Sequence, residues 1–288
     1  MTAVPPPPSS ATPPGTFDPA AQARVRAPSG TRRRWGLLIL GLLAAFAALG
    51  PALLGIDPAR QSLADSLLPP GSAHWLGTDL FGRSTVARLA HAAQLSLGLS
   101  LAASASAALA GVLLGVAASW SGGAAERWLV LLADAVLAVP GLLLVLLFAT
   151  LAPGQHWALY LGLSLSLWVE YFRVSRAASR PVLASDAVQA SRLLGFGPAY
   201  LLRRHVLPAL APVLGTLLPF TAAQAVLALA ALGFIGVGIQ PPTAELGLMM
   251  TEALPHYEEA PWLIAAPVGL LVWLVLGMAL VARPGEPA

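Results

Sequence analysis

The stretch Trp35–Gly55, "WGLLILGLLAAFAALGPALLG", contains no charged side chain. A helix of about 20 apolar residues is long enough to cross the hydrocarbon core of a bilayer. The whole chain is 57% hydrophobic and only 10% charged, with a mean hydropathy of +0.75. These values lie outside the range of water-soluble domains. The sequence therefore predicts an all-α membrane protein.

Further apolar runs follow Trp35–Gly55, and each is close to the length of a membrane span. We predict five of them, which makes six transmembrane helices in total. The predicted spans are Leu95–Ser119, Leu129–Thr150, Trp157–Val169 with a few flanking residues, Val213–Phe234 and Trp262–Val281.

Arginines are distributed unevenly among the connections, and in membrane proteins the basic segments stay in the cytoplasm. The N-terminal segment and the fourth connection should therefore be cytoplasmic, and six spans place the C-terminus there too. The connection 57–93 should face outward. The arginines on which this orientation depends are Arg24, Arg26, Arg32, Arg33, Arg34, Arg173, Arg176, Arg180, Arg192, Arg203 and Arg204.

The predicted organisation has four parts. Residues 1–31 are rich in proline and should form a disordered cytoplasmic tail. Residues 32–93 hold the first span and an extracytoplasmic segment. Residues 94–282 form the core of the membrane domain, with a cytoplasmic loop near 185–208, and residues 283–288 form a short cytoplasmic tail.

The fourth connection, "QASRLLGFGPAYLLRRHVLP" at 189–208, has the pattern of a helix, a turn and a second helix. Gly195 should turn the chain, Pro198 can begin the second helix, and Pro208 marks the entry to the next span. Arg203 and Arg204 are available to acidic partners or to lipid headgroups. The alternative is a basic interfacial loop with no further role.

This loop resembles the EAA signature of ABC-importer permeases. The residues that fall on the template are Gln189, Ala190, Ser191, Gly195, Leu207 and Pro208. In that family the loop docks into a cleft of the ATP-binding subunit, so the resemblance implies that these residues, with Arg203 and Arg204, couple the chain to an ATPase. Gln189 replaces the usual Glu, and Ser191 replaces the second Ala.

A second stretch, "HWLGTDLFGRSTVARLAHAAQLSL" at 74–97, resembles the block that precedes the second span in dipeptide, oligopeptide and nickel permeases. The residues that keep the spacing are Gly77, Thr78, Asp79, Gly82 and Arg83. Trp75 replaces Pro and Ser84 replaces Asp. The third span also resembles the family at Arg127, Asp134, Pro140 and Gly141.

The resemblance covers about Trp35–Met278 and implies a type I ABC-importer permease of the C type in a bacterial or archaeal cytoplasmic membrane. Such a subunit works by alternating access with a second permease, two ATP-binding subunits and an extracytoplasmic solute-binding protein. Dipeptides or oligopeptides are the expected substrates, and nickel or a metal chelate is the alternative. From another class, a secondary transporter or an integral membrane enzyme would need more ionisable residues at the midplane.

Three patterns bear on more specific roles. Asp134 lies in an apolar span, either as a functional group or, as we favour, as a polar anchor near Arg127. Gly111 and Gly115 form a GxxxG pattern, which indicates close helix packing. The histidines lack metal-ligand spacing, and the chain has no GxxxxGK[ST] and no lysine. The sequence thus predicts a transport subunit without metal, cofactor, nucleic acid or catalytic residues.

Overall fold

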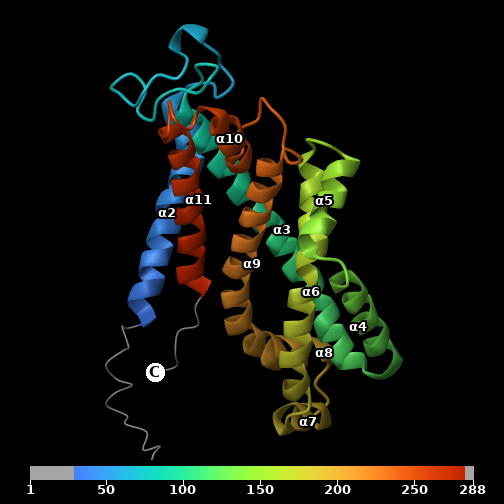
Figure 1. The fold of residues 1–288 in the computed structure, drawn as a ribbon. Helices are drawn as coiled ribbons and strands as arrows, with labels where there is room; N and C mark the ends of the chain where they lie inside the picture. Colours follow the sequence, from blue (N-terminus) through green and yellow to red (C-terminus); the bar gives the residue numbers. More distant parts are fainter. Residues whose placement is uncertain (1–28, 283–288) are drawn as a thin grey trace, which may run out of the picture.

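The computed structural model describes residues 29–282, so the predicted tails fall almost wholly outside the described residues. The described part is helical, and its only bridge of strand type is an isolated one between Thr78 and Ser84. Figure 1 shows the helices as a bundle. In chain order the elements are α2 (Ser29–Leu54), η1 (Leu63–Asp65), α3 (Thr85–Ser121), α4 (Gly123–Leu137), α5 (Gly141–Leu151), α6 (His156–Leu183), α7 (Asp186–Leu193), α8 (Pro198–Leu201), η2 (Leu202–Val206), α9 (Leu207–Ile235), α10 (Leu246–Ala253), η3 (Leu254–His256) and α11 (Trp262–Ala282).

The spans agree with a polytopic membrane protein. Within residues 29–282, α2, α3, α11 and the stretch formed by α8, η2 and α9 are each long and apolar enough to cross a bilayer. The bent pair α4 and α5 passes the same criterion as one span. The remaining long helix, α6, runs beside α3 and carries Arg173, Arg176 and Arg180 in its second half. The all-α fold is confirmed, and six crossings are compatible with it.

The third span differs from the prediction. Leu129–Thr150 was expected to be one helix, but α4 and α5 meet at an angle of 75°. Pro140 causes the break, because it has no N–H to continue the helical ladder and it disfavours helical backbone at the residue before it. Pro140 itself is extended, with φ −53° and ψ 129°, and α5 begins at the next residue.

The connections gather at two ends of the bundle (Figure 1). The loop between α2 and α3 lies at one end together with α10, which we call the α10 end. The helices α7 and α8, the start of α2 and the end of α11 lie at the other end, which we call the α7 end. The start of α2 and the segment that contains α7 and α8 therefore lie at the same end, whereas Arg24 and Arg26 fall outside the described residues.

The most extensive helix contact is between α3 and α6. Gly111 and Gly115 face α6, and a Cβ atom at Gly115 would lie 2.6 Å from the carbonyl oxygen of Phe172. A Cβ atom at Gly111 would meet the backbone of Trp168 and lie 2.5 Å from the Cβ atom of Tyr171. The predicted role of the GxxxG pattern in close packing is confirmed.

The helix α9 changes character along its length. Pro208, Pro212 and Pro219 lie in its first half. Before Pro208, η2 forms a π-turn in which the N–H of Leu207 bonds to the carbonyl of Leu202. Proline clashes with the carbonyl four residues earlier, and the wider turn avoids that clash. Helix formation therefore continues through Pro208.

The close approach of α3 and α6 predicts a specific sensitivity. Gly111→Ala should lower the melting temperature of the purified chain, because overpacking costs about 1–3 kcal/mol. Gly98→Ala, in the same helix with nothing within 4 Å of the added Cβ, is the control and should be neutral or slightly stabilising. Equal melting temperatures for the two variants in detergent would contradict this account of the contact.

Candidate functional site

Two polar regions stand apart from the apolar bundle, one at each end. The first is the segment 185–208 at the α7 end, which we call the α7–α8 turn. As predicted, a helix precedes Gly195 and a second begins at Pro198. Gly195 has φ +83°, a left-handed conformation that side chains with a Cβ rarely adopt. No neighbouring atom lies within 4 Å of a Cβ placed there, so the backbone angle alone calls for glycine.

Internal contacts hold the two arms of the α7–α8 turn together. The Ser191 hydroxyl donates to the carbonyl of Ala187 at 2.8 Å and lies 3.2 Å from His205 Nε2. Phe196 and Tyr200 stack with ring centroids 4.2 Å apart, and Tyr200 meets the His205 ring edge-on. The Ser191 that replaces alanine in the signature thus contacts the histidine on the second arm.

The outer surface of the turn is both apolar and polar. Leu193 is 90% exposed and Leu194 is 76% exposed. Gln189 is also exposed, and its Nε2 donates to the carbonyl of Ala184 at 3.1 Å. Two leucines at the tip of a short helix are unusual for a surface that meets only water. The remaining signature residues are exposed as well: Ala190, Arg203, Arg204, Leu207 and Pro208.

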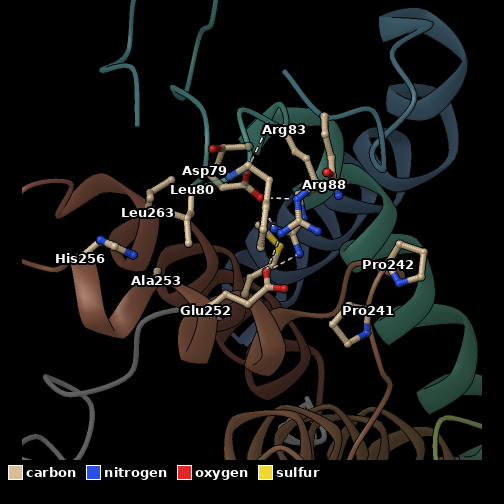
Figure 2. Close-up of a pocket in the computed structure, with 14 residues that line it drawn as sticks. Asp79, Leu80, Arg83, Arg88, Pro241, Pro242, Glu252, Ala253, His256 and Leu263 are labelled. Carbon is tan, nitrogen blue, oxygen red and sulfur yellow. Dashed lines mark hydrogen bonds and ion pairs between the residues drawn. The ribbon is translucent and has the colours of Figure 1, made fainter. Parts of the chain in front are cut away.

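The second region is a cluster of four charged side chains at the α10 end, Asp79, Arg83, Arg88 and Glu252, which we call the four-charge cluster (Figure 2). Asp79 Oδ2 accepts from Arg83 Nε at 2.6 Å and from Arg88 Nη1 at 2.5 Å. Arg83 Nη2 donates to Glu252 Oε2 at 3.2 Å. Arg88 Nη2 also lies 2.6 Å from Glu252 Oε2, but its N–H bonds do not point at that oxygen, so this contact is an ion pair without a hydrogen bond.

The Asp79 carboxylate also organises its own loop. Its Oδ1 accepts from the backbone N–H groups of Phe81 and Arg83, both at 2.9 Å. Gly82 permits this tight turn with φ +67°, and any side chain there would collide with the backbone of Ser62. Gly77 and Thr78 are buried just before it, and the Thr78 hydroxyl donates to the carbonyl of Asp65. The five predicted motif residues therefore lie in one folded loop.

The four-charge cluster lines a cavity of about 390 Å³. Figure 2 shows Asp79 and both arginines on one side and Glu252, from α10, on the other. Arg83 and Arg88 are 3% and 2% exposed, and two carboxylates balance their charges. The cluster therefore ties the loop between α2 and α3 to α10 without leaving a net charge.

A carboxylate also caps α10. Glu245 Oε2 accepts from the N–H of Leu248 at 2.9 Å. Burial raises the pKa of Glu245 above its usual value, although backbone N–H donors of the first turn act in the opposite direction. Glu245 packs against Gly233 near the end of α9, so the cap joins α10 to α9.

Asp134 makes a contact that the sequence did not predict. Its Oδ1 accepts from Arg173 Nη2 of α6 at 2.6 Å, and both side chains are about half exposed. Arg127, named from the sequence as its neighbour, instead donates to the carbonyl of Gly123. In residues 29–282, no group of three His, Asp or Glu side chains is placed to hold a metal ion.

Comparison with known proteins identifies the family. Residues 107–283 match the family described as "Binding-protein-dependent transport system inner membrane component". The chain belongs to this family. It is thus a permease, a transport subunit and not an enzyme, which confirms the resemblance of the sequence to importer permeases.

Curated relatives of the permease extend over most of its length. The "Di/tripeptide transport system permease protein DppC" of Pseudomonas aeruginosa is 38% identical over 83% of this chain and 80% of that protein. The "Dipeptide transport system permease protein DppC" of Haemophilus influenzae is 31% identical over 85% of each. The "Oligopeptide transport system permease protein OppC" of Bacillus subtilis is 29% identical over 85% and 81%.

Sequence reasoning found part of this site and missed two members of the four-charge cluster. Arg88 lies in the stretch 74–97 but is not among the residues that keep the motif spacing, and Glu252 lies in none of the predicted motifs. Arg88 is flanked by the apolar residues Val86, Ala87, Leu89 and Ala90, which was a usable signal that it is buried with a partner. Glu252 is far away in the sequence, so the pattern near Asp79 contained no sign of it.

Removing one member of the four-charge cluster should destabilise the permease. Arg88→Gln leaves the buried Asp79 and the partly buried Glu252 with too few donors, and breaking a buried ion pair in this way costs about 3–5 kcal/mol. Arg60→Gln, an exposed arginine of the same loop, is the control and should change little. The measurement is the melting temperature in detergent, and a loss no larger for Arg88→Gln than for Arg60→Gln would contradict the prediction.

Proposed function

We propose that this permease is a subunit of an ATP-driven importer of dipeptides or oligopeptides. The peptide substrate is supported by the relatives named above, whose printed names describe di/tripeptide, dipeptide and oligopeptide transport. The proposed partners are a second permease, two ATP-binding subunits and an extracytoplasmic solute-binding protein. The mechanism is alternating access, with peptide entering between the two permeases after release from the binding protein.

The exposed α7–α8 turn is the observation that carries the proposed coupling role. Leu193 and Leu194 form an apolar tip that a cleft of an ATP-binding subunit would cover. The second arm continues through η2 directly into α9, in one helical stretch from Pro198 to Ile235. Movement of the tip by the ATPase would therefore be transmitted to a membrane span.

The proposed orientation places the α7 end in the cytoplasm, together with both termini, in a bacterial or archaeal cytoplasmic membrane. Arginines of the α7–α8 turn and of the α2 start lie at this end. At the α10 end, Arg83 and Arg88 are neutralised by Asp79 and Glu252. The excess of positive charge at the α7 end supports this orientation.

Cysteine labelling tests the orientation. The chain has no cysteine, so Ala73→Cys and Ala199→Cys, both at exposed positions, each create a single thiol. An impermeant maleimide added to intact cells should label position 73 and should label position 199 only after the membrane is permeabilised. The reverse pattern would place the α7–α8 turn outside the cell and remove its proposed role.

Replacing Gly195 tests the coupling role. Gly195→Leu should lower uptake of a radiolabelled dipeptide by roughly tenfold or more, because left-handed backbone costs about 1–2 kcal/mol with a Cβ and the turn would re-form elsewhere. The spans are untouched, so the protein level should stay normal.

Two variants serve as controls for Gly195→Leu. Gly197→Leu adds the same side chain two residues on, at a φ of −74° with open space around it, and should transport normally. Gly195→Asn should retain most uptake, because asparagine tolerates the left-handed conformation. Normal uptake by Gly195→Leu would refute the coupling role, and uptake of nickel instead of dipeptide would refute the proposed substrate.

A further inference from the structure

A cavity of about 470 Å³ lies between the start of α4 and the end of α6, near the α7 end of the bundle. Its lining combines charged and apolar side chains: Glu126, Arg127, Val130, Leu131, Arg176 and Arg180. The coupling role proposed above does not involve it. Because the apolar pair α4 and α5 begins here, the cavity lies where charged and apolar side chains meet.

The charges of the cavity do not balance. Glu126 Oε1 accepts from Arg176 Nε at 2.7 Å and lies 2.6 Å from Arg176 Nη2. Arg180 Nη1 is 3.8 Å from the same oxygen, too far for a hydrogen bond. Arg127 donates only to a backbone carbonyl at 3.3 Å. One carboxylate thus faces three guanidinium groups, and two of these retain most of their donors.

Apolar side chains continue from the cavity along α4. Val130 and Leu131 line its wall, and the exposed fractions of Trp128, Leu131 and Leu132 on the helix surface are 72%, 57% and 52%. In a bilayer such a surface faces acyl chains, and tryptophan is enriched at the headgroup level. A ligand that fits both features has an anionic head and an apolar tail.

We propose that this cavity binds the phosphate headgroup of an anionic phospholipid, with Arg127 and Arg180 donating to the phosphate oxygens and one acyl chain lying along Val130 and Leu131. Glu126 holds Arg176 in place beside them. Basic pockets between membrane helices suit such headgroups, and two guanidinium groups give several donors to one phosphate. The inference rests on membership of a membrane-permease family and is independent of the transported substrate and of the coupling role.

The test compares lipid retention by the full-length chain, purified together with any partner subunits that accompany it. The probe is phosphatidylglycerol, counted per chain by native mass spectrometry after exchange into phosphatidylcholine nanodiscs of stepwise increasing phosphatidylglycerol content. The double variant Arg127→Gln and Arg180→Gln should weaken retention by roughly tenfold or more, since each arginine near an anionic surface contributes on the order of fivefold.

The matched control removes two arginines from the same end of the bundle. Arg32→Gln with Arg34→Gln, at the exposed start of α2, should leave retention close to that of the unchanged chain. Equal losses in both double variants would show a general attraction of positive charge to anionic lipid and would overturn the proposed site. Phosphatidylglycerol should also raise the melting temperature, whereas inorganic phosphate added to pure phosphatidylcholine nanodiscs should not. An equal rise with inorganic phosphate would show that the apolar wall has no role, and the proposal would fail.

A variant that is expected to strengthen lipid retention separates lipid binding from a loss of structure. Glu126→Gln removes the carboxylate that competes with phosphate, so it should strengthen retention of phosphatidylglycerol. Weaker retention at an unchanged melting temperature would contradict the proposal. Crosslinking of a photoreactive group at Arg180 to an acidic segment of a partner subunit, in place of lipid, would assign the cavity to a protein contact and would also overturn it.

Discussion

The contact between α3 and α6 is the constraint on which the rest of the structure depends. At Gly111 and Gly115 the two helix backbones come so close that there is no room for a Cβ atom. Between apolar helices in lipid there is little hydrophobic driving force, so dispersion contacts at short range must provide the association. The start of α3 carries Arg88 and the end of α6 leads into α7, so this pair fixes the distance between the two polar regions.

The two ends of the bundle use arginine in different ways. At the α10 end, the guanidinium groups of Arg83 and Arg88 are almost fully buried and have carboxylate partners, which gives a rigid and neutral joint. At the α7 end, several guanidinium groups are exposed and exceed the carboxylates near them. The buried ion pairs at the α10 end stabilise the fold of this chain. The arrangement at the α7 end leaves donors for other molecules, and both of our proposals for binding therefore lie at that end.

The sequence predicted features that depend on local chemistry. The apolar runs, the turn at Gly195 and the second helix at Pro198 follow from side-chain hydropathy and backbone preference, and the structure contains them. The coupling assignment of these residues stays a prediction. The bend at Pro140 could have been predicted from the backbone preference of proline. The apolar run continues on both sides of Pro140, however, so hydropathy alone indicated one helix where the structure has α4 and α5.

Contacts between distant segments could not be predicted in this way. Glu252 lies 169 residues beyond Arg83, and no periodicity relates the two. The pairing of Asp134 with Arg173 depends on how α4 tilts against α6, which in turn follows from the unpredicted bend. Spacing within a motif indicates which residues share a loop, whereas the partners of that loop are set by the packing of whole helices.

The proline content of α9 has a consequence for the stiffness of this span. Each of Pro208, Pro212 and Pro219 leaves a carbonyl one turn earlier without its helical donor, so the first half has fewer bonds resisting flexure. The second half contains most of the buried residues of the helix and is braced by α10 at Gly233. If α8 is pushed sideways, α9 should therefore bend mainly between Leu207 and Pro219. The second half, which packs against α10, should keep its shape.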